Sequence, residues 1–120
     1  MSAPIDLGDS VNQGTTYVIT REILDTNDTP IPQANLTTLV LTLYERTGSG
    51  ILNARDHVDV KSMVDAAGLL TLELTPADNV MLTGGAEEFH VVLLEWTYNG
   101  GSRRGSGELV FRVRRVPKAA

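Results

Sequence analysis

The densest group of potential metal ligands in the chain is the run RDHVD, in which the carboxylates of Asp56 and Asp59 flank the imidazole of His57. Oxygen and nitrogen ligands of this kind can bind a divalent cation. Successive side chains of a strand point to opposite faces, so Asp56 and His57 would diverge, and no second ligand pair follows at a defined spacing. We therefore expect a solvated loop here and no metal site.

Candidates for acid–base or nucleophilic catalysis are equally weak. His90 lies in the same predicted strand as Trp96 and lacks an orienting acid and a nucleophile, so we expect it to pack or to form a hydrogen bond. Glu87 and Glu88 are adjacent, and adjacent strand side chains diverge. The glycine-rich stretches GSG and GGSRRGSG lack the lysine and the following helix of a phosphate-binding loop. The sequence predicts a protein that is not an enzyme, with no cofactor and no small-molecule substrate.

The feature that stands out is a row of cations near the end of an acidic chain. The formal net charge is -5, yet residues 103–120 alone carry a net +5. In the run GELVFRVRRV, a period of two places Arg112 and Arg114, with Val110, on one face of a strand and Leu109, Phe111 and Val113 on the other. The sequence therefore segregates positive charge onto one strand face.

Two interpretations of this row stay open. Charge on an edge strand can protect it against edge-to-edge aggregation. Alternatively, Arg112 and Arg114, aided by Arg103 and Arg104, form a docking face for an acidic neighbour, since arginine binds carboxylates with two parallel hydrogen bonds. Nucleic acid is a poor partner because the rest of the chain is acidic and its aromatic residues are too few for a stacking platform.

A second candidate contact surface lies in the stretch EEFHVVLLEWTYN, residues 87–99, which is apolar in both phases. Such a pattern predicts a central strand that is covered on both sides. The additional apolar face consists of Phe89, Val91 and Leu93. Either other elements of the monomer cover this face, for example the loop 51–68, or a partner does.

The rest of the sequence predicts an all-β domain. Alternating patterns predict strands at 15–23, 37–45 and 69–75, before the strand at 87–99 and the terminal strand, with a short edge strand near Val58 and Val60. Thr75, Pro76 and Asp78 predict one short helical turn, and NGG predicts a hairpin turn.

About six or seven short strands with one helical turn are typical of an antiparallel β-sandwich, with an immunoglobulin-like topology as the first choice and a small closed barrel as the alternative. We expect residues 1–14 to form an extended N-terminal arm and residues 15–120 to form a single domain. No secretory signal pattern and no apolar run long enough to cross a membrane occur, and the chain has no cysteine, so we expect no membrane contact and a chain compatible with a reducing compartment.

The segments REILDTNDTPIP, LTLYERTGSGILNARDHV, GLLTLELTPADN and EFHVVLLEWTYNGG together resemble small immunoglobulin-like structural proteins of tailed-phage virions. The resemblance covers about residues 15–116. It implies a non-enzymatic component of the head, neck or tail that is present in many copies, assembles in the host bacterial cytoplasm and binds other virion proteins such as coat or connector subunits. Head decoration or cement and a neck or tail position are both consistent with it, and residues 1–14 would become ordered on assembly. A carbohydrate- or receptor-binding sandwich module is the alternative function.

Overall fold

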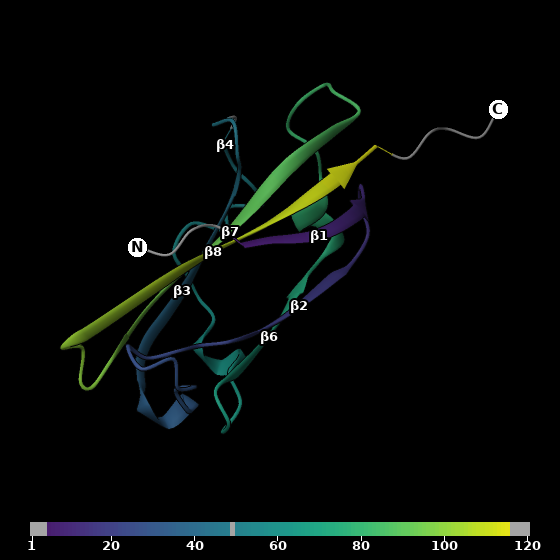
Figure 1. Ribbon diagram of the computed structural model, residues 1–120. Coiled ribbons are helices and arrows are strands. Elements are labelled where there is room, and N and C mark those ends of the chain that lie inside the picture. Colours follow the sequence, from purple (N-terminus) through teal and green to yellow (C-terminus); the bar gives the residue numbers. More distant parts are fainter. Residues whose placement is uncertain (1–4, 49, 116–120) are drawn as a thin grey trace.

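The computed structural model describes residues 5–48 and 50–115 and shows a protein built mostly of β-strands (Figure 1). The larger sheet has the order β1-β8-β7-β3-β4, with the two-residue strand β5 paired to β3, and a second sheet consists of β2 and β6. The strands are β1 (Ile5–Asn12), β2 (Tyr17–Glu22), β3 (Leu36–Glu45), β4 (Gly50–Ile51), β5 (Val58–Asp59), β6 (Leu69–Leu74), β7 (Glu87–Tyr98) and β8 (Arg103–Arg114). Since the described strands fall into two separate sheets, they do not form the closed barrel that was the alternative.

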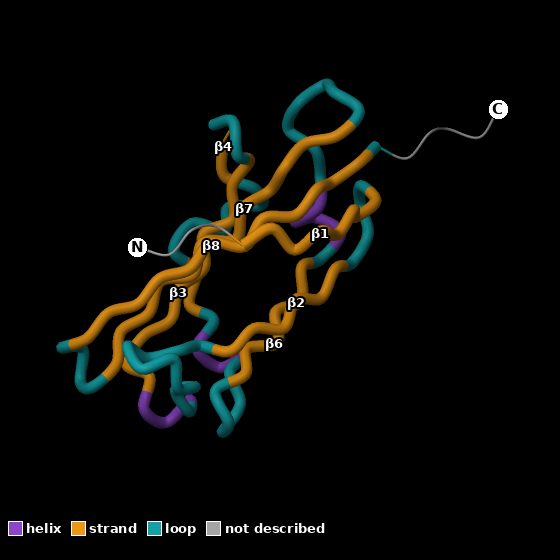
Figure 2. Tube along the Cα trace, in the orientation of Figure 1, coloured by secondary structure: helices purple, strands orange, loops and turns teal. Residues whose placement is uncertain are grey.

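The alternation seen in the sequence places one apolar core between the two sheets. Leu39, Leu41 and Leu43 of β3 are fully buried, and so are the leucines of β6 at positions 70, 72 and 74. In Figure 2, β2 and β6 lie beside each other and apart from the larger sheet. Core residues from both sheets belong to a single hydrophobic cluster. Period-two burial therefore works as predicted on β3 and β6.

The two longest strands, β7 and β8, form a hairpin of twelve residues on each side. Their register is continuous from Glu87 opposite Arg114 to Tyr98 opposite Arg103. The turn between them contains Asn99 at φ 53°, followed by two glycines, also at positive φ. Such left-handed positions suit Asn and Gly, and the hairpin predicted from NGG is confirmed.

The N-terminal segment differs from its expected form as an arm. Residues Ile5–Asn12 form β1, which pairs with β8 in parallel, with Ile5 opposite Leu109 and Val11 opposite Val113. Val11 is only 6% exposed and belongs to the core. The sequence pattern missed this strand because its second half, Gly8 to Ser10, is glycine and polar residues, and its register on β8 shifts between Asp6 and Ser10. The prediction of a wholly antiparallel arrangement is wrong at this pair.

Residues 51–68 contribute to the core between the sheets. Leu52, Val60 and Val64 are all at most 2% exposed and belong to the same hydrophobic cluster. The short edge strand expected near Val58 is present as β5, which pairs with β3. Because Leu52, Val60 and Val64 point into the core and Ile51 and Met63 are exposed, this segment does not provide the apolar cover expected for Phe89, Val91 and Leu93.

Three short 3-10 helices complete the described chain, η1 (Gln33–Asn35), η2 (Lys61–Met63) and η3 (Pro76–Asn79). The predicted helical turn is η3, and Thr75 and Asp78 form the reciprocal capping box. The other two were not predicted. Among the described residues, no helix is long and apolar enough to cross a membrane.

Candidate partner-binding site

The face of the larger sheet that points away from β2 and β6 is here called the outer face. Its side chains include Phe89, Val91 and Leu93 of β7, together with Val110 and Arg112 of β8, as strand alternation requires. Val91 and Val110 are 2% and 6% exposed, yet neither belongs to the core cluster between the sheets. The outer face therefore carries a second apolar strip, as the two-phase pattern of β7 predicted.

Two arginines enclose the aromatic end of this strip. The guanidinium carbon of Arg46 lies 4.0 Å from the centroid of the Phe89 ring, and that of Arg112 lies 5.8 Å from it. Nη1 of Arg112 also donates a hydrogen bond to Oε2 of Glu87 at 3.1 Å. A cation over an aromatic face stabilises the pair by about 0.5–1 kcal/mol at an exposed site. Sequence analysis missed Arg46 because it comes from the turn after β3, far from β8 in the chain.

Further along the strip, Tyr44 and Glu108 approach each other from the strands on either side of β7. Tyr44 is opposite Val91, and Glu108 is opposite Leu93. Burial, together with the charge of the Glu108 carboxylate and a hydrogen bond to it, raises the pKa of the Tyr44 phenol. Long polar side chains of this same chain thus cover much of the apolar strip. The monomer itself therefore covers part of this apolar strip, which was one of the two alternatives, and it does so through Tyr44 and Glu108 rather than through the loop 51–68.

The four arginines predicted as one docking face do not form one patch. Arg104, Arg112 and Arg114 share the outer phase of β8, whereas Arg103 has the opposite phase at the hairpin end. At about 3.3 Å per residue, Arg104 and Arg112 lie about 26 Å apart along the strand. The structure brings together Arg112, Arg114 and Phe89 and leaves Arg103 and Arg104 at the far end.

These arginines also differ in their partners. Arg103, Arg104 and Arg114 are exposed, and within residues 5–48 and 50–115 none of them forms an ion pair. The Arg112–Glu87 pair is about half exposed on both sides, at 43% and 48%. A pair of this exposure contributes about 0–1 kcal/mol, so a competing carboxylate can replace Glu87 at little cost.

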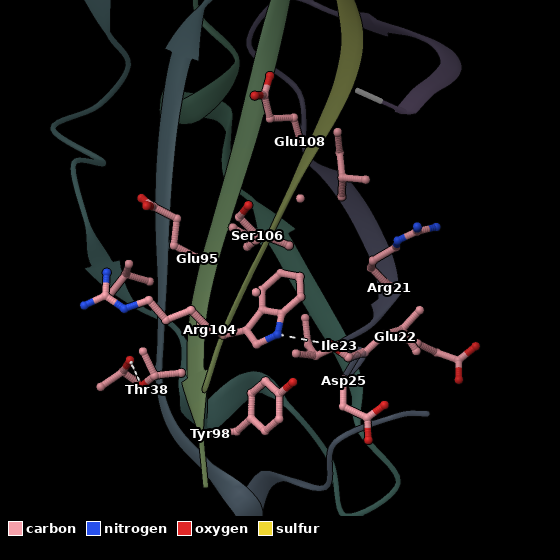
Figure 3. A pocket seen from close by; sticks show the side chains of 18 of the residues that line it. Arg21, Glu22, Ile23, Asp25, Thr38, Glu95, Tyr98, Arg104, Ser106 and Glu108 are labelled. Carbon is pink, nitrogen blue, oxygen red and sulfur yellow. Dashed lines mark hydrogen bonds between the residues drawn. The ribbon is translucent and has the colours of Figure 1, made fainter. Parts of the chain in front are cut away.

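A groove lies at the Arg104 end of the molecule, between β8 and the end of β2, with a volume of about 860 Å³ (Figure 3). Trp96 lines it, and its indole Nε1 donates a hydrogen bond to the Leu24 carbonyl at 3.2 Å. A Cβ added at Gly105 would fall 2.4 Å from the same Nε1. The indole is therefore held between the β8 backbone and the segment after β2, and sequence analysis did not predict this groove.

In the RDHVD segment, residues 55–57 form a bend with His57 at positive φ, and Val58–Asp59 form β5. In this bend His57 Nδ1 lies 2.6 Å from Asp56 Oδ1, and His57 Nε2 lies 3.4 Å from Glu95 Oε1. The expected divergence of Asp56 and His57 is wrong because it assumed an extended backbone. In the described part of the chain, no three His, Cys, Asp or Glu side chains are placed to hold a metal ion.

His90 is fully buried and forms a hydrogen bond, as expected. Its Nε2 lies 2.5 Å from Oε2 of Glu88, and its ring meets Phe111 edge-on at 5.6 Å. Burial lowers the pKa of His90, against the opposing effects of the Glu88 and Glu45 carboxylates. Glu88 is therefore the acid that the sequence did not reveal, two residues away on the same strand face. No nucleophilic side chain hydrogen-bonds to His90 in the described chain, and the pair lies inside the core.

Comparisons of the chain with protein-family models, with curated protein sequences and with solved structures found no match.

Proposed function

We propose that this chain is a non-enzymatic structural protein of a tailed-phage virion, which decorates or cements the head or occupies a neck or tail position. In this proposal it docks on neighbouring virion subunits, in many copies, through the Arg112 end of the outer face. The observation that carries the proposal is the group formed by Arg112, Arg114 and Phe89, in which Arg114 has no acidic partner among the described residues. Exposed arginine beside a partly buried aromatic ring is a combination enriched at protein interfaces.

The fold proposed for this role is an immunoglobulin-like sandwich. Pairing of β2 with β6, and of β3 with β7 and β7 with β8, corresponds to the B–E and C–F–G pairings of that fold. One core shared by both sheets supports a sandwich. The chain departs from antibody domains because it has no cysteine for the inter-sheet disulfide, and its single tryptophan lies on β7 instead of β3.

The chemistry of the partner follows from the group at Arg112. An acidic surface of a coat or connector subunit would supply carboxylates to Arg114 and compete with Glu87 for Arg112. Its contact with Phe89 would remove the remaining exposed ring surface from water. Because the chain carries -5 overall, the positive end of β8 also orients an approaching acidic partner toward this end.

The test is the double variant Arg112→Glu with Arg114→Glu, produced in a phage that encodes the chain. We expect the copy number per purified particle, measured by quantitative mass spectrometry, to fall at least tenfold. The thermal unfolding midpoint of the isolated variant should change by only a few degrees. Arg21→Glu is the matched control because Arg21 lies on the other sheet.

Normal incorporation of a stable double variant would contradict the docking role. Absence of the wild-type chain from purified particles would contradict the virion assignment itself.

The alternative function, a carbohydrate- or receptor-binding module, has the groove beside Trp96 as its site. Sugar recognition uses exposed flat rings, whereas the Trp96 indole is held by the Leu24 carbonyl and lies against the backbone of Gly105. The observations therefore favour the structural role over this alternative.

A further inference from the structure

One row of apolar side chains crosses the outer face of the larger sheet. Val91 of β7 is opposite Val110 of β8 on one side and opposite Tyr44 of β3 on the other. Tyr44 is in turn opposite Ile51 of β4. Residues that are opposite each other in a ladder project from the same face. Ile51 is 41% exposed. We call these four residues the apolar row.

The residues on the two sides of the apolar row differ in charge. Toward the start of β7, Phe89 is opposite Arg112, and Arg46 lies over the same ring from the β3 side. Toward the end of β7, Leu93 is opposite Glu108, whose side chain is half-buried. The apolar row is therefore flanked by cations on one side and by a carboxylate on the other, at equal distances along β8.

We propose that two copies of this chain associate with their outer faces in contact, about a two-fold axis that runs along the apolar row. This axis is perpendicular to the strands, so each strand lies over the same strand of the second copy in the opposite direction. Arg112 then lies over Glu108 of the second copy, and Phe89 lies over Leu93 of the second copy. Because a two-fold axis repeats each contact, one dimer contains two such Arg–Glu pairs.

Charge favours this direction and this position of the axis. With the strands of the two copies parallel, the arginines at the start of β7 would meet at the same end of the dimer, and like charges repel. An axis shifted to Leu93 would place Arg112 over Arg104 of the second copy, and an axis shifted to Phe89 would place Arg112 over itself. A shift by two residues in either direction therefore replaces an Arg–Glu contact by an Arg–Arg contact.

The arrangement also gives a carboxylate to Arg114, which forms no ion pair within residues 5–48 and 50–115. Glu95 of the second copy lies over Glu87, and Arg114 is opposite Glu87 on the next strand. Arg114 can therefore interact with both carboxylates and offset the repulsion between them. At the β1 rim, Asp6 faces Asp6 of the second copy, but it is exposed, so this repulsion is weak.

Glu108 is accessible to the second copy although it already interacts with Tyr44. A carboxylate has two oxygens and can accept from Arg112 of the second copy as well. In the same way, the Arg112–Glu87 pair is about half exposed, and its guanidinium has further N–H groups to donate. Neither contact within the chain has to break when the dimer forms.

The size of the contact indicates a weak dimer. Residues 87–95 extend about 26 Å along β7, and β3, β7 and β8 together are about 14 Å wide. The resulting face of about 360 Å² per copy is less than half of the about 800 Å² that each partner contributes to a standard interface. We therefore expect micromolar or weaker affinity.

The inference goes beyond the proposed function, because it concerns the chain in solution and uses only the charge pattern of the outer face. A virion subunit that docks on Arg112 and Arg114 would displace the second copy, so the two contacts are alternatives at one face.

The experiment is sedimentation velocity over a concentration series of the full chain and its variants. Wild type should show a reversible monomer–dimer equilibrium. Arg112→Glu and Glu108→Arg should each weaken the dimer by at least about tenfold, because both symmetric charge pairs become like-charge contacts. The double variant Arg112→Glu with Glu108→Arg should recover most of the lost affinity, because each glutamate again faces an arginine.

The matched control is Arg103→Glu, which makes the same charge change on the inner phase of β8, away from the outer face. It should dimerise within about threefold of wild type. Thermal unfolding of each variant separates loss of association from loss of fold.

A second measurement locates the axis. The chain has no cysteine, so a single introduced cysteine reports only its own surroundings. Ile51 lies on the proposed axis and would face Ile51 of the second copy, so a short bifunctional maleimide should join Ile51→Cys into a covalent dimer. Val18→Cys is the matched control, since Val18 is 52% exposed but lies on β2, in the other sheet. Intact mass spectrometry gives the yield of each.

The proposal is overturned if wild type stays monomeric to millimolar concentration, or if it forms only larger oligomers. It is equally overturned if Arg112→Glu and Arg103→Glu behave alike, if a folded double variant stays monomeric, or if the two cysteine variants are joined to the same extent. The charge exchange restores association between copies but not docking on an acidic virion subunit, so failure here and failure of the virion role can be told apart.

Discussion

At the scale of single residues, the carboxylate of Asp78 is fully buried and forms several hydrogen bonds. Its carboxylate accepts hydrogen bonds from Arg55 at 2.8 and 2.9 Å, from Asn53 at 2.9 Å and from the Thr75 backbone at 2.7 Å. Burial alone would raise the pKa of Asp78, but these donors hold it below its usual value. The cluster joins the turn after β4 to η3, so it is structural.

We predict that Asp78→Asn lowers the free energy of unfolding by about 3 kcal/mol, because an amide NH₂ would replace one of the two oxygens that face these donors and leave Arg55 without a counter-charge. Urea unfolding measures the change. Asp28→Asn is the control, since Asp28 is exposed in a turn at positive φ where Asn fits well, and it should change stability by less than about 0.5 kcal/mol. Equal effects of the two variants would contradict the structural role of the cluster.

His90 gives the molecule a defined response to pH. Its pKa is lowered in the folded state, so between that value and the unfolded value of about 6.5 the unfolded chain binds a proton that the folded chain does not. Stability contributed by neutral His90 is therefore complete above about pH 6.5 and declines as the pH falls below it. The lowered pKa of Glu88, caused by backbone donors at Leu82 and Thr83 that outweigh its burial, adds a loss in the same direction at lower pH.

We expect the thermal midpoint to fall between pH 7.5 and pH 5.5, and His90→Gln to remove most of this dependence while lowering stability at both values. The comparison is differential scanning calorimetry of the two proteins across that range. A wild-type midpoint that is flat across the range would refute the prediction.

At the scale of elements, the β7–β8 hairpin depends on a close approach between a side chain and a backbone. Trp96 is opposite Gly105 in the register, and a Cβ at Gly105 would lie 2.4 to 2.7 Å from three atoms of the indole. At Gly107 the nearest indole atom would lie at 3.8 Å, which is an ordinary contact. Glycine is therefore required at only one of these two positions.

We predict that Gly105→Ala destabilises the protein by about 1–3 kcal/mol through overpacking, whereas Gly107→Ala changes stability by at most about 1 kcal/mol in either direction. Since the chain has one tryptophan, its fluorescence reports the same site directly. Gly105→Ala should shift the emission maximum, and Gly107→Ala should not. If both variants unfold like wild type, the packing described for Trp96 is wrong.

At the scale of the whole molecule, β1 makes the N-terminal segment part of the sheet. It extends the larger sheet beyond β8 and pairs with the second half of that strand, from Leu109 to Arg114. Tyr17 at the start of β2 packs against Phe111 of β8 at 4.9 Å between ring centroids, and its hydroxyl hydrogen-bonds to Asp9 of β1. The segment expected to become ordered on assembly is thus paired within the chain from Ile5 onward.

We predict that Val11→Ala costs about 2 kcal/mol of folding free energy, because Val11 is buried beside Val113. Ser10→Ala, one residue away and exposed, should stay within about 0.5 kcal/mol of wild type. Chemical denaturation of both variants provides the measurement. An arm outside the domain would make both substitutions neutral, which is the result that would exclude a structural β1.

The sequence alone predicted those elements whose signal is local. Period-two alternation located β2, β3 and β6, and a run that is apolar in both phases located β7. Turn chemistry located the β7–β8 hairpin, and the Thr75–Asp78 spacing located η3 with its capping box. The apolar outer phase of β7 was also predicted correctly. Each of these depends on residues that are neighbours in the chain, so the pattern carries the information directly.

Only the tertiary structure decided which distant side chains meet. It placed Arg46 on Phe89, Glu108 against Tyr44 and β1 beside β8, and it separated Arg104 from Arg112 along one strand. Alternation fixes the face on which a strand residue lies, but it contains no information about which strand is adjacent or where its pairing begins. Those are set by the free energy of packing the two sheets around one core, which depends on the whole chain at once.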